Sequence, residues 1–312
     1  MQIIFFGSDQ YSSLVLMSLT QQENLLVSAV VTTRPKPVGR DHVLTPNPVE
    51  KYAVKQNIKV VYYPDNLDEM SKFISTLPIT SDTHGLSASF PRIMPSSLIG
   101  AFSGRLYNLH PSLLPQFRNV APVPYAIALG EPATGITLFR IGDGIDNGEI
   151  LTQTQEPIVK TDSTPILLTR LFKKGTELFT SWLTNSTHPT HVSQAHDKGG
   201  LIFTHKLTRE FGYVEWPVIL KLIVNHPIFE TETQNPLVKL RLTHFPDRNN
   251  NILSDLIRAL DGYEKVWTIA KTKKGPLEIS FKLENGSSST FAILIAGKPR
   301  PLAWDDFVAS YL

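Results

Sequence analysis

Short apolar runs alternate with segments of helical period through the first half of the 312-residue chain. Residues 2–6 form a mainly apolar run that ends at Gly7, and residues 11–19 then carry apolar side chains at helical spacing, which predicts a strand, a tight turn and a helix. A β-rich run at residues 25–33 is followed by a helical pattern at residues 48–56 that begins with proline. Strands that alternate with helices in this way favour an α/β fold.

The same alternation continues toward residue 185. Strands are predicted at residues 58–63, 105–109 and 135–141, and a helix at residues 95–102. Residues 165–185 place leucine and phenylalanine at helical spacing and predict one longer amphipathic helix. The predicted fold is therefore α/β, with an open, mainly parallel, Rossmann-like sheet.

A different pattern follows the long helix. Residues 185–191 show no periodicity, which indicates a linker. Beyond about residue 205, apolar segments alternate with Gly, Asn and Pro turns, which favours strands and a small barrel; they are residues 237–242, 265–269, 277–281 and 290–295. We predict an α/β domain at residues 1–190, a linker at residues 191–204 and a C-terminal β-barrel (OB-like) domain at residues 205–312.

The amino-acid composition excludes several kinds of chemistry but says little about binding partners. The formal charge of +2 and the pI near 8.6 give a weak basic bias, so charge alone does not identify a nucleic-acid binder. The chain has no cysteine, which excludes disulfides, thiolate metal sites and a cysteine nucleophile. The apolar runs have strand length, so we expect no membrane span, and the histidines lack metal-ligand spacing, so we expect no metal.

Candidate chemistry lies where the strand at residues 105–109 ends. Residues two apart in a strand share a face, so Asn108 and His110 are expected to point into one pocket at the carboxyl end of the sheet, where α/β proteins bind ligands. The turn-rich loop at residues 142–148 carries Asp146, a carboxylate within reach of that pocket. Together the three groups suit acyl transfer, although an isolated Asn-x-His pair is more often structural, and Asp143 and Asp146 alone would be ordinary turn aspartates.

The extended pattern resembles a known family. Asn-x-His-Pro-Ser-Leu-Leu-Pro at residues 108–115, followed by Ile-Asp-x-Gly at residues 145–148, is similar to the signature of formyltransferases that use 10-formyltetrahydrofolate. The resemblance implies that Asn108 stabilises charge on the formyl oxygen, that His110 relays the amine proton and that Asp146 orients the ring. It also implies a folate-binding wall and no metal. That wall consists of Ser112, Leu113, Leu114, Pro115 and Phe90.

Further segments are similar to the branch of this family that formylates methionyl-tRNA, namely residues 4–11, 34–40, 204–209 and 298–307. This resemblance implies that formyl moves from 10-formyltetrahydrofolate to the methionine amine of initiator Met-tRNA, in support of translation initiation. The C-terminal domain would then contact tRNA. Candidate tRNA-binding residues are Arg34, Lys36, Arg40, Lys206 and Arg209, and a solvated surface role is the alternative for each.

Two positions depart from the family pattern. Pro91 replaces a glycine and removes a backbone N–H, which puts a contact to the pterin in question, and Asn119 replaces the glycine after Arg118. Two other functions stay open: a formyltransferase acting on an amino-sugar nucleotide, which the modest charge would suit, and a non-catalytic folate- or tRNA-binding descendant, which Pro91 and Asn119 leave open. The less basic loop after residue 40 resembles mitochondrial members, so we expect the mitochondrial matrix; a bacterial cytoplasm is the alternative, since no presequence is visible. Separately, we expect a monomer.

Overall fold

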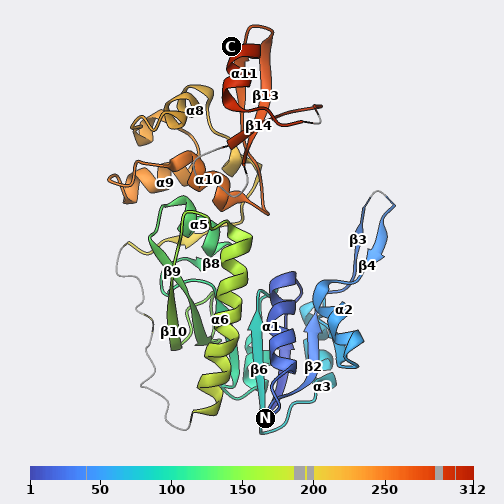
Figure 1. The fold of residues 1–312 in the computed structure, drawn as a ribbon. Helices are drawn as coiled ribbons and strands as arrows, with labels where there is room; N and C mark the ends of the chain where they lie inside the picture. Colours follow the sequence, from blue (N-terminus) through green and yellow to red (C-terminus); the bar gives the residue numbers. More distant parts are fainter. Residues whose placement is uncertain (40, 186–193, 195–199, 285–290, 299) are drawn as a thin grey trace. The chain divides into compact units, whose positions relative to one another are not determined.

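The computed structural model describes residues 1–39, 41–185, 194, 200–284, 291–298 and 300–312 (Figure 1). The chain forms two compact units. The first unit comprises Met1–Arg118, Gly135–Glu156 and Leu168–Ile202, and the second comprises Asn119–Thr134, Pro157–Leu167 and Phe203–Leu312. Of the predicted linker, only Gln194 and residues 200–204 lie in the described part, and the division at residues 190 and 205 stays a prediction.

A seven-stranded sheet forms the centre of the first unit. The strands β5, β2, β1, β6 and β7 run parallel, and β9 is antiparallel to β7. The predicted open, mainly parallel α/β sheet is thus confirmed. In spatial order the strands are β10 (Ile150–Pro157), β9 (Ala133–Arg140), β7 (Leu106–His110), β6 (Thr83–Ala88), β1 (Gln2–Phe6), β2 (Leu26–Thr32) and β5 (Lys59–Tyr62).

The first strand, turn and helix form as the pattern predicts. Helix α1 (Gln10–Thr20) begins after Asp9, whose carboxylate accepts a hydrogen bond from the Ser12 backbone N–H at 2.8 Å. The turn requires Gly7, because a Cβ there would lie 2.5 Å from the Ser12 Cβ. Helix α2 (Pro48–Lys55) likewise starts with proline behind an asparagine cap.

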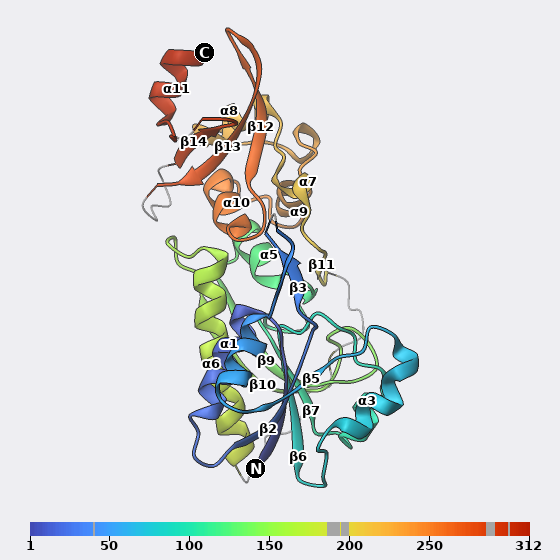
Figure 2. The ribbon, with the colours of Figure 1, turned by 90° about the vertical axis from the view of Figure 1, so that its right-hand side faces the viewer.

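Helices cover both faces of this sheet. On one face, α3 (Met70–Thr76) and α4 (Ser96–Ala101) bury apolar side chains against Ile4 and Phe6 of β1. On the other face lie α1 and the long helix α6 (Thr164–Thr184), which approaches the sheet closely because Gly175 leaves no side chain between α6 and Ile136. Figure 2 shows α3 across the sheet from α1 and α6. These helices cover the faces of the sheet, and ligands in such folds bind at the carboxyl ends of the parallel strands.

Some elements of the first unit escaped prediction. Between the strand predicted at residues 25–33 and the helix predicted at residues 48–56 lies a short antiparallel ribbon, β3 (Lys36–Val38) paired with β4 (Val43–Thr45), which projects from this unit in Figure 1. The strand β6 was missed because Thr83, His84 and Gly85 interrupt its apolar pattern. The short helices η1 (Leu67–Glu69) and α3 were missed as well.

The second unit contains a three-stranded antiparallel sheet of β12 (Val266–Thr272), β13 (Gly275–Leu283) and β14 (Phe291–Ile295). This sheet is consistent with a small barrel-like domain. The prediction of a strand at residues 237–242 is wrong, because Asn235 caps a helix there and Pro236 starts it. The other elements of this unit are α5 (Pro122–Ala128), β11 (Phe203–Thr204), α7 (Arg209–Gly212), α8 (Trp216–Ile223), η2 (Glu230–Glu232), α9 (Pro236–His244), α10 (Ile252–Leu260) and α11 (Trp304–Tyr311). The two-residue strand β8 (Arg118–Asn119) has one residue in each unit.

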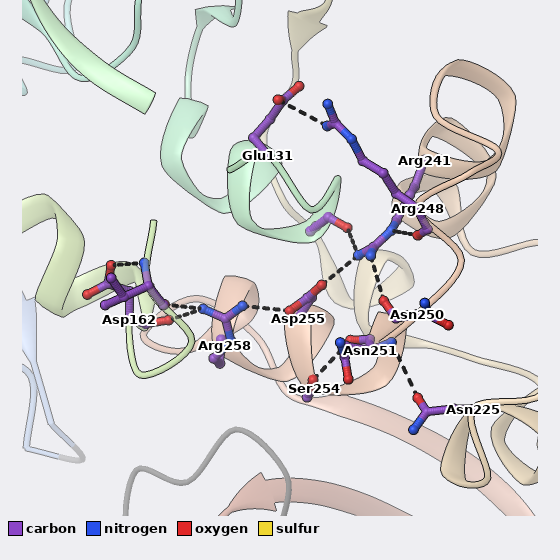
Figure 3. A network of polar contacts seen from close by, with 12 residues as sticks. Glu131, Asp162, Asn225, Arg241, Arg248, Asn250, Asn251, Ser254, Asp255 and Arg258 are labelled. Carbon is purple, nitrogen blue, oxygen red and sulfur yellow. Dashed lines mark hydrogen bonds and ion pairs between the residues drawn. The ribbon is translucent and has the colours of Figure 1, made fainter. Parts of the chain in front are cut away.

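A buried charge network ties the parts of the second unit together (Figure 3). Asp255 on α10 pairs with Arg241 at 2.8 Å and with Arg258 at 2.5 Å. Arg241 also donates to the carbonyl of Ala128 at the end of α5, and Arg258 donates to the carbonyl of Asp162. The C-terminal helices are thereby joined to two segments that come much earlier in the chain. Burial lowers the pKa of Arg241, and Asp255 opposes this effect.

Candidate active site

His110 and Asp146 meet at the carboxyl end of β7. The Nδ1 atom of His110 lies 3.5 Å from Oδ2 of Asp146, and the two side chains are only 5% and 17% exposed. On the other side of the ring, Nε2 lies 2.8 Å from the carbonyl oxygen of Phe117. Because a carbonyl only accepts hydrogen bonds, Nε2 carries a hydrogen, and the ring orientation is fixed from both sides.

Asn108 occupies the same strand two residues earlier. Its register places it beside Ser87 of β6 and Phe139 of β9, and it is half-buried between fully buried neighbours. The pleat of β7 puts it on the same face as His110. Within the described part of the chain, its amide makes no hydrogen bond, so this donor is free for a ligand at the strand end.

The turn after His110 is held by residues that the sequence did not single out. Thr137 of β9 donates its hydroxyl to the Ser112 carbonyl at 2.6 Å and accepts from the Leu114 backbone N–H at 3.1 Å. Gln153 of β10 donates to the Leu114 carbonyl at 2.9 Å. The peptide bond between Leu114 and Pro115 is cis. Side chains on the neighbouring strands β9 and β10 thus fix the turn, and no local sequence motif encodes these contacts.

The predicted folate wall divides into two groups. Ser112 and Leu114 are buried, and the Ser112 hydroxyl donates to a backbone carbonyl within the turn, so these two side chains shape the turn itself. Leu113 and Pro115 are half-exposed. Phe90 is also half-exposed, with its ring packed edge-on against two buried aromatic rings. The second group supplies apolar surface beside the end of β7.

The two departures from the family pattern have different surroundings. Asn119 has a φ of +81°, a conformation that favours glycine and that asparagine tolerates better than most residues. Its side-chain amide donates to the Thr204 carbonyl at 2.9 Å, which adds a contact that glycine would lack. Pro91 is exposed and lies two residues after Ser89, whose hydroxyl donates to Asp9 at 2.5 Å. Asn119 therefore preserves the required backbone conformation.

The basic residues of the first unit differ in their availability. Arg34 lies 3.6 Å from the Asp65 carboxylate, Nε to Oδ2, and 5.5 Å above the Tyr62 ring. Lys36 is exposed on β3. Arg40 lies outside the described residues.

In the second unit, Lys206 is exposed, whereas Arg209 is engaged by two neighbours. Its guanidinium pairs with Glu278 at 2.9 Å and lies 4.4 Å over the Trp267 ring. Predicted phosphate contacts from Arg209 would compete with this ion pair.

A cavity of about 290 Å³ opens at the opposite end of the strands, away from His110. His84, Arg105 and Tyr107 contribute to its lining, and each stands at or just before the beginning of β6 or β7. Burial lowers the pKa of His84, and the nearby Arg105 lowers it further. Since Asn108, His110 and Asp146 do not line it, this cavity is separate from the candidate active site.

The described residues contain no group of three His, Asp or Glu side chains arranged to hold a metal ion. Among the same residues, no helix is both long enough and apolar enough to span a bilayer.

Comparisons with known proteins agree with the pattern at the strand end. The family model described as "Formyl transferase" matches residues 1–183. The chain is 34% identical over 225 residues to a methionyl-tRNA formyltransferase of Staphylococcus epidermidis, which covers 72% of this chain and 71% of that protein. It is 38% identical over 176 residues to a methionyl-tRNA formyltransferase of Pediococcus pentosaceus, and this match covers 56% of the chain and 54% of the relative.

A solved structure shares the fold over nearly the whole chain. It is an N-formyltransferase from Helicobacter canadensis in complex with folinic acid and dTDP-3-aminofucose, with a TM-score of 0.54 at 18% identity. The likeness covers 94% of this chain and 95% of that one. At this identity, the likeness supports the fold of the chain alone.

Proposed function

The chain belongs to the formyl transferase family, in its methionyl-tRNA formyltransferase branch, and on that premise we propose that it formylates the methionine amine of initiator Met-tRNA in support of translation initiation. The formyl donor is 10-formyltetrahydrofolate. The observation that carries the proposal is the pair of His110 and Asp146, buried together at the carboxyl end of β7.

The reaction forms a bond between the amine nitrogen and the formyl carbon and breaks the bond between that carbon and the donor nitrogen. The attacking amine loses a proton, the departing nitrogen gains one, and negative charge develops on the formyl oxygen. Three groups are therefore needed: a hydrogen-bond donor for the oxygen, a path for the proton and something that orients both.

Asn108 meets the first need, since its amide has no partner within the described residues and lies on the His110 face of β7. A side-chain amide N–H at the end of a strand can donate to the formyl oxygen as negative charge develops there. The imidazole of His110 and the carboxylate of Asp146 form the proton path. The Phe117 carbonyl holds the ring from behind, so that His110 and Asp146 act as one unit.

Folate binding is part of the proposal. The bound donor supplies the formyl carbon, and the chain would provide the surface for its flat ring system. Leu113, Pro115 and Phe90 are apolar, half-exposed and adjacent to the end of β7, which suits such a ring. Ser112 and Leu114 would act indirectly by shaping the turn.

The tRNA contacts are proposed for basic side chains on both units. Lys36 and Lys206 are exposed and available to phosphate, and Arg34 and Arg209 would exchange an acidic partner for it. Arg40 belongs to the same proposal. A monomer in the mitochondrial matrix stays a prediction, which mass measurement in solution and organelle fractionation would test.

Transfer of labelled formyl from 10-formyltetrahydrofolate tests the function. Initiator Met-tRNA, elongator Met-tRNA and an amino-sugar nucleotide serve as parallel acceptors. We expect selective labelling of initiator Met-tRNA. Labelling of the sugar nucleotide would instead identify an amino-sugar formyltransferase, and folate binding without transfer to any acceptor would identify a non-catalytic descendant.

A further inference from the structure

The side chain of Gln194 joins the two segments that carry the candidate active site. It is 4% exposed. Its Oε1 accepts hydrogen bonds from Arg118, at 3.1 Å from Nε and 2.7 Å from Nη2. Its Nε2 donates to the backbone carbonyls of Asp146 and Gly148, at 3.0 and 2.7 Å. One buried amide therefore connects the turn after His110 with the loop that carries Asp146.

The loop depends on such support. Asp146 has a φ of +48°, a conformation that costs a residue with a side chain free energy and persists only where the surroundings hold it. At the end of the loop, Gly148 passes so close to Arg140 that a Cβ would lie 1.8 Å from its carbonyl oxygen. The two carbonyls bound by Gln194 thus belong to the residues whose backbone geometry decides where the Asp146 carboxylate points.

The chemistry of this position is specific to an amide. The Arg118 guanidinium only donates, so it requires an acceptor, whereas the two loop carbonyls only accept, so they require a donor. Arg118 is itself 5% exposed, which makes an unpaired guanidinium costly. A glutamine satisfies both sides. A carboxylate would satisfy Arg118 alone, and a cationic side chain would satisfy the carbonyls alone.

We propose that Gln194 is a positioning residue, which places the Asp146 carboxylate against the His110 ring by holding the Asp146 and Gly148 carbonyls. Gln194 contacts the backbone of the loop and acts on the reaction through Asp146. The expected effect on catalysis rests on the proposed function, whereas the role of Gln194 in holding the loop does not depend on it. The sequence pattern assigned this residue to a linker.

The substitution Gln194→Glu keeps the contacts of the amide oxygen with Arg118 and removes the hydrogen bonds that the amide nitrogen donates to the loop. The carboxylate keeps the pair with buried Arg118, so the fold is retained, but it faces the two loop carbonyls without a hydrogen to donate. We expect kcat for formyl transfer to fall about 10–100-fold, as for other residues that orient a catalytic group, with KM for both substrates within about twofold of wild type. Gln155→Glu makes the same chemical change at an exposed position of β10 and should leave kcat unchanged.

A double-mutant cycle distinguishes positioning from a general structural effect. If Gln194 acts through the Asp146 carboxylate, Gln194→Glu should lower kcat in the wild-type background and have little further effect in an Asp146→Asn background. Equal losses in both backgrounds would overturn the proposal, as would a wild-type kcat in Gln194→Glu. If Gln194→Glu does not fold, Gln194→Met, which keeps the length and removes all four hydrogen bonds, enters the same cycle.

Hydrogen exchange provides a readout that does not require turnover. Amides of residues 142–148 should exchange faster in Gln194→Glu than in Gln155→Glu, because the loop loses two anchoring hydrogen bonds. Unchanged exchange would overturn the proposal even in an active enzyme. Conversely, faster exchange in a protein that transfers no formyl would retain the role of Gln194 in holding the loop and reject the proposed function.

Discussion

The His110 ring and the Asp146 carboxylate lie 3.5 Å apart, Nδ1 to Oδ2, although one ends strand β7 and the other belongs to the loop after β9. Both side chains are largely shielded from water. Electrostatic coupling between such groups is stronger than at an exposed site, because less solvent screens it. The carboxylate therefore helps to orient the ring for its proposed role in relaying the amine proton.

Replacing His110 tests this pair most directly. His110→Ala should lower formyl transfer about 10²–10⁴-fold, the range typical of a lost general acid–base group, while the circular dichroism spectrum stays unchanged. His226→Ala, at an exposed histidine of the second unit, is the matched control. Turnover of His110→Ala equal to that of His226→Ala would exclude the proposed proton path.

Replacing Asn108 gives a separate test, because Asn108 is proposed to stabilise the formyl oxygen rather than to relay the amine proton. Asn108→Ala should reduce kcat about 10²–10³-fold, as loss of one donor to a developing oxyanion does, with little change in KM. The exposed Asn24 provides a control in Asn24→Ala. A rise in KM with an unchanged kcat would instead assign Asn108 to substrate binding.

The sequence predicted those parts of the fold that local pattern encodes. The predicted strand ending at Phe6, the turn at Gly7 and the helix over residues 11–19 follow one another directly in the chain, and each agrees with the structure. The chemistry of β7 was accessible for the same reason, since Asn108 and His110 are two residues apart. Strand β6 was not predicted, because Thr83, His84 and Gly85 interrupt its apolar pattern and one strand beside it, β1, is distant in sequence.

Residues that act by supporting others were beyond the reach of sequence pattern. Thr137 and Gln153 hold the turn after His110 from neighbouring strands, and Gln194 reaches the Asp146 loop from the segment predicted as a linker. None of them belongs to a motif with a recognisable spacing. In the second unit, Asn235 and Pro236 form a helix-start signal that the prediction of a strand at residues 237–242 did not use.

The charge network of the second unit predicts a large stability effect. Asp255→Asn leaves the buried guanidinium groups of Arg241 and Arg258 without their shared carboxylate, which should cost about 3–5 kcal/mol in the free energy of unfolding measured with urea. Glu278→Gln removes an exposed ion pair with Arg209 and should cost no more than about 1 kcal/mol. Similar costs for the two variants would contradict a structural role for the Asp255 network.

His84 predicts a pH dependence of stability. Burial lowers its pKa below the ordinary 6.5, and Arg105 adds to this effect while Asp82 opposes it. As the pH falls through about 6.5, the unfolded chain binds a proton at His84 before the folded protein does, so this residue makes folding less favourable at acid pH. The unfolding free energy of wild type should therefore drop relative to that of His84→Phe between pH 7.5 and 5.5. A pH-independent difference would show that His84 does not contribute.

Asn119 tests whether a departure from the family pattern impairs the protein. Asn119→Gly removes the strain of the positive φ but also loses the hydrogen bond to the Thr204 carbonyl. The two effects oppose each other and are each on the order of 1 kcal/mol, so stability and turnover should stay close to wild type. Asn119→Ala loses the hydrogen bond and adds strain, and should be about 2 kcal/mol less stable by urea unfolding. Equal stability of the Gly and Ala variants would show that the backbone conformation does not set the requirement. A large gain in turnover in Asn119→Gly would show that asparagine suppresses activity. Unchanged turnover would show that asparagine supports full activity at a position where the family pattern has glycine.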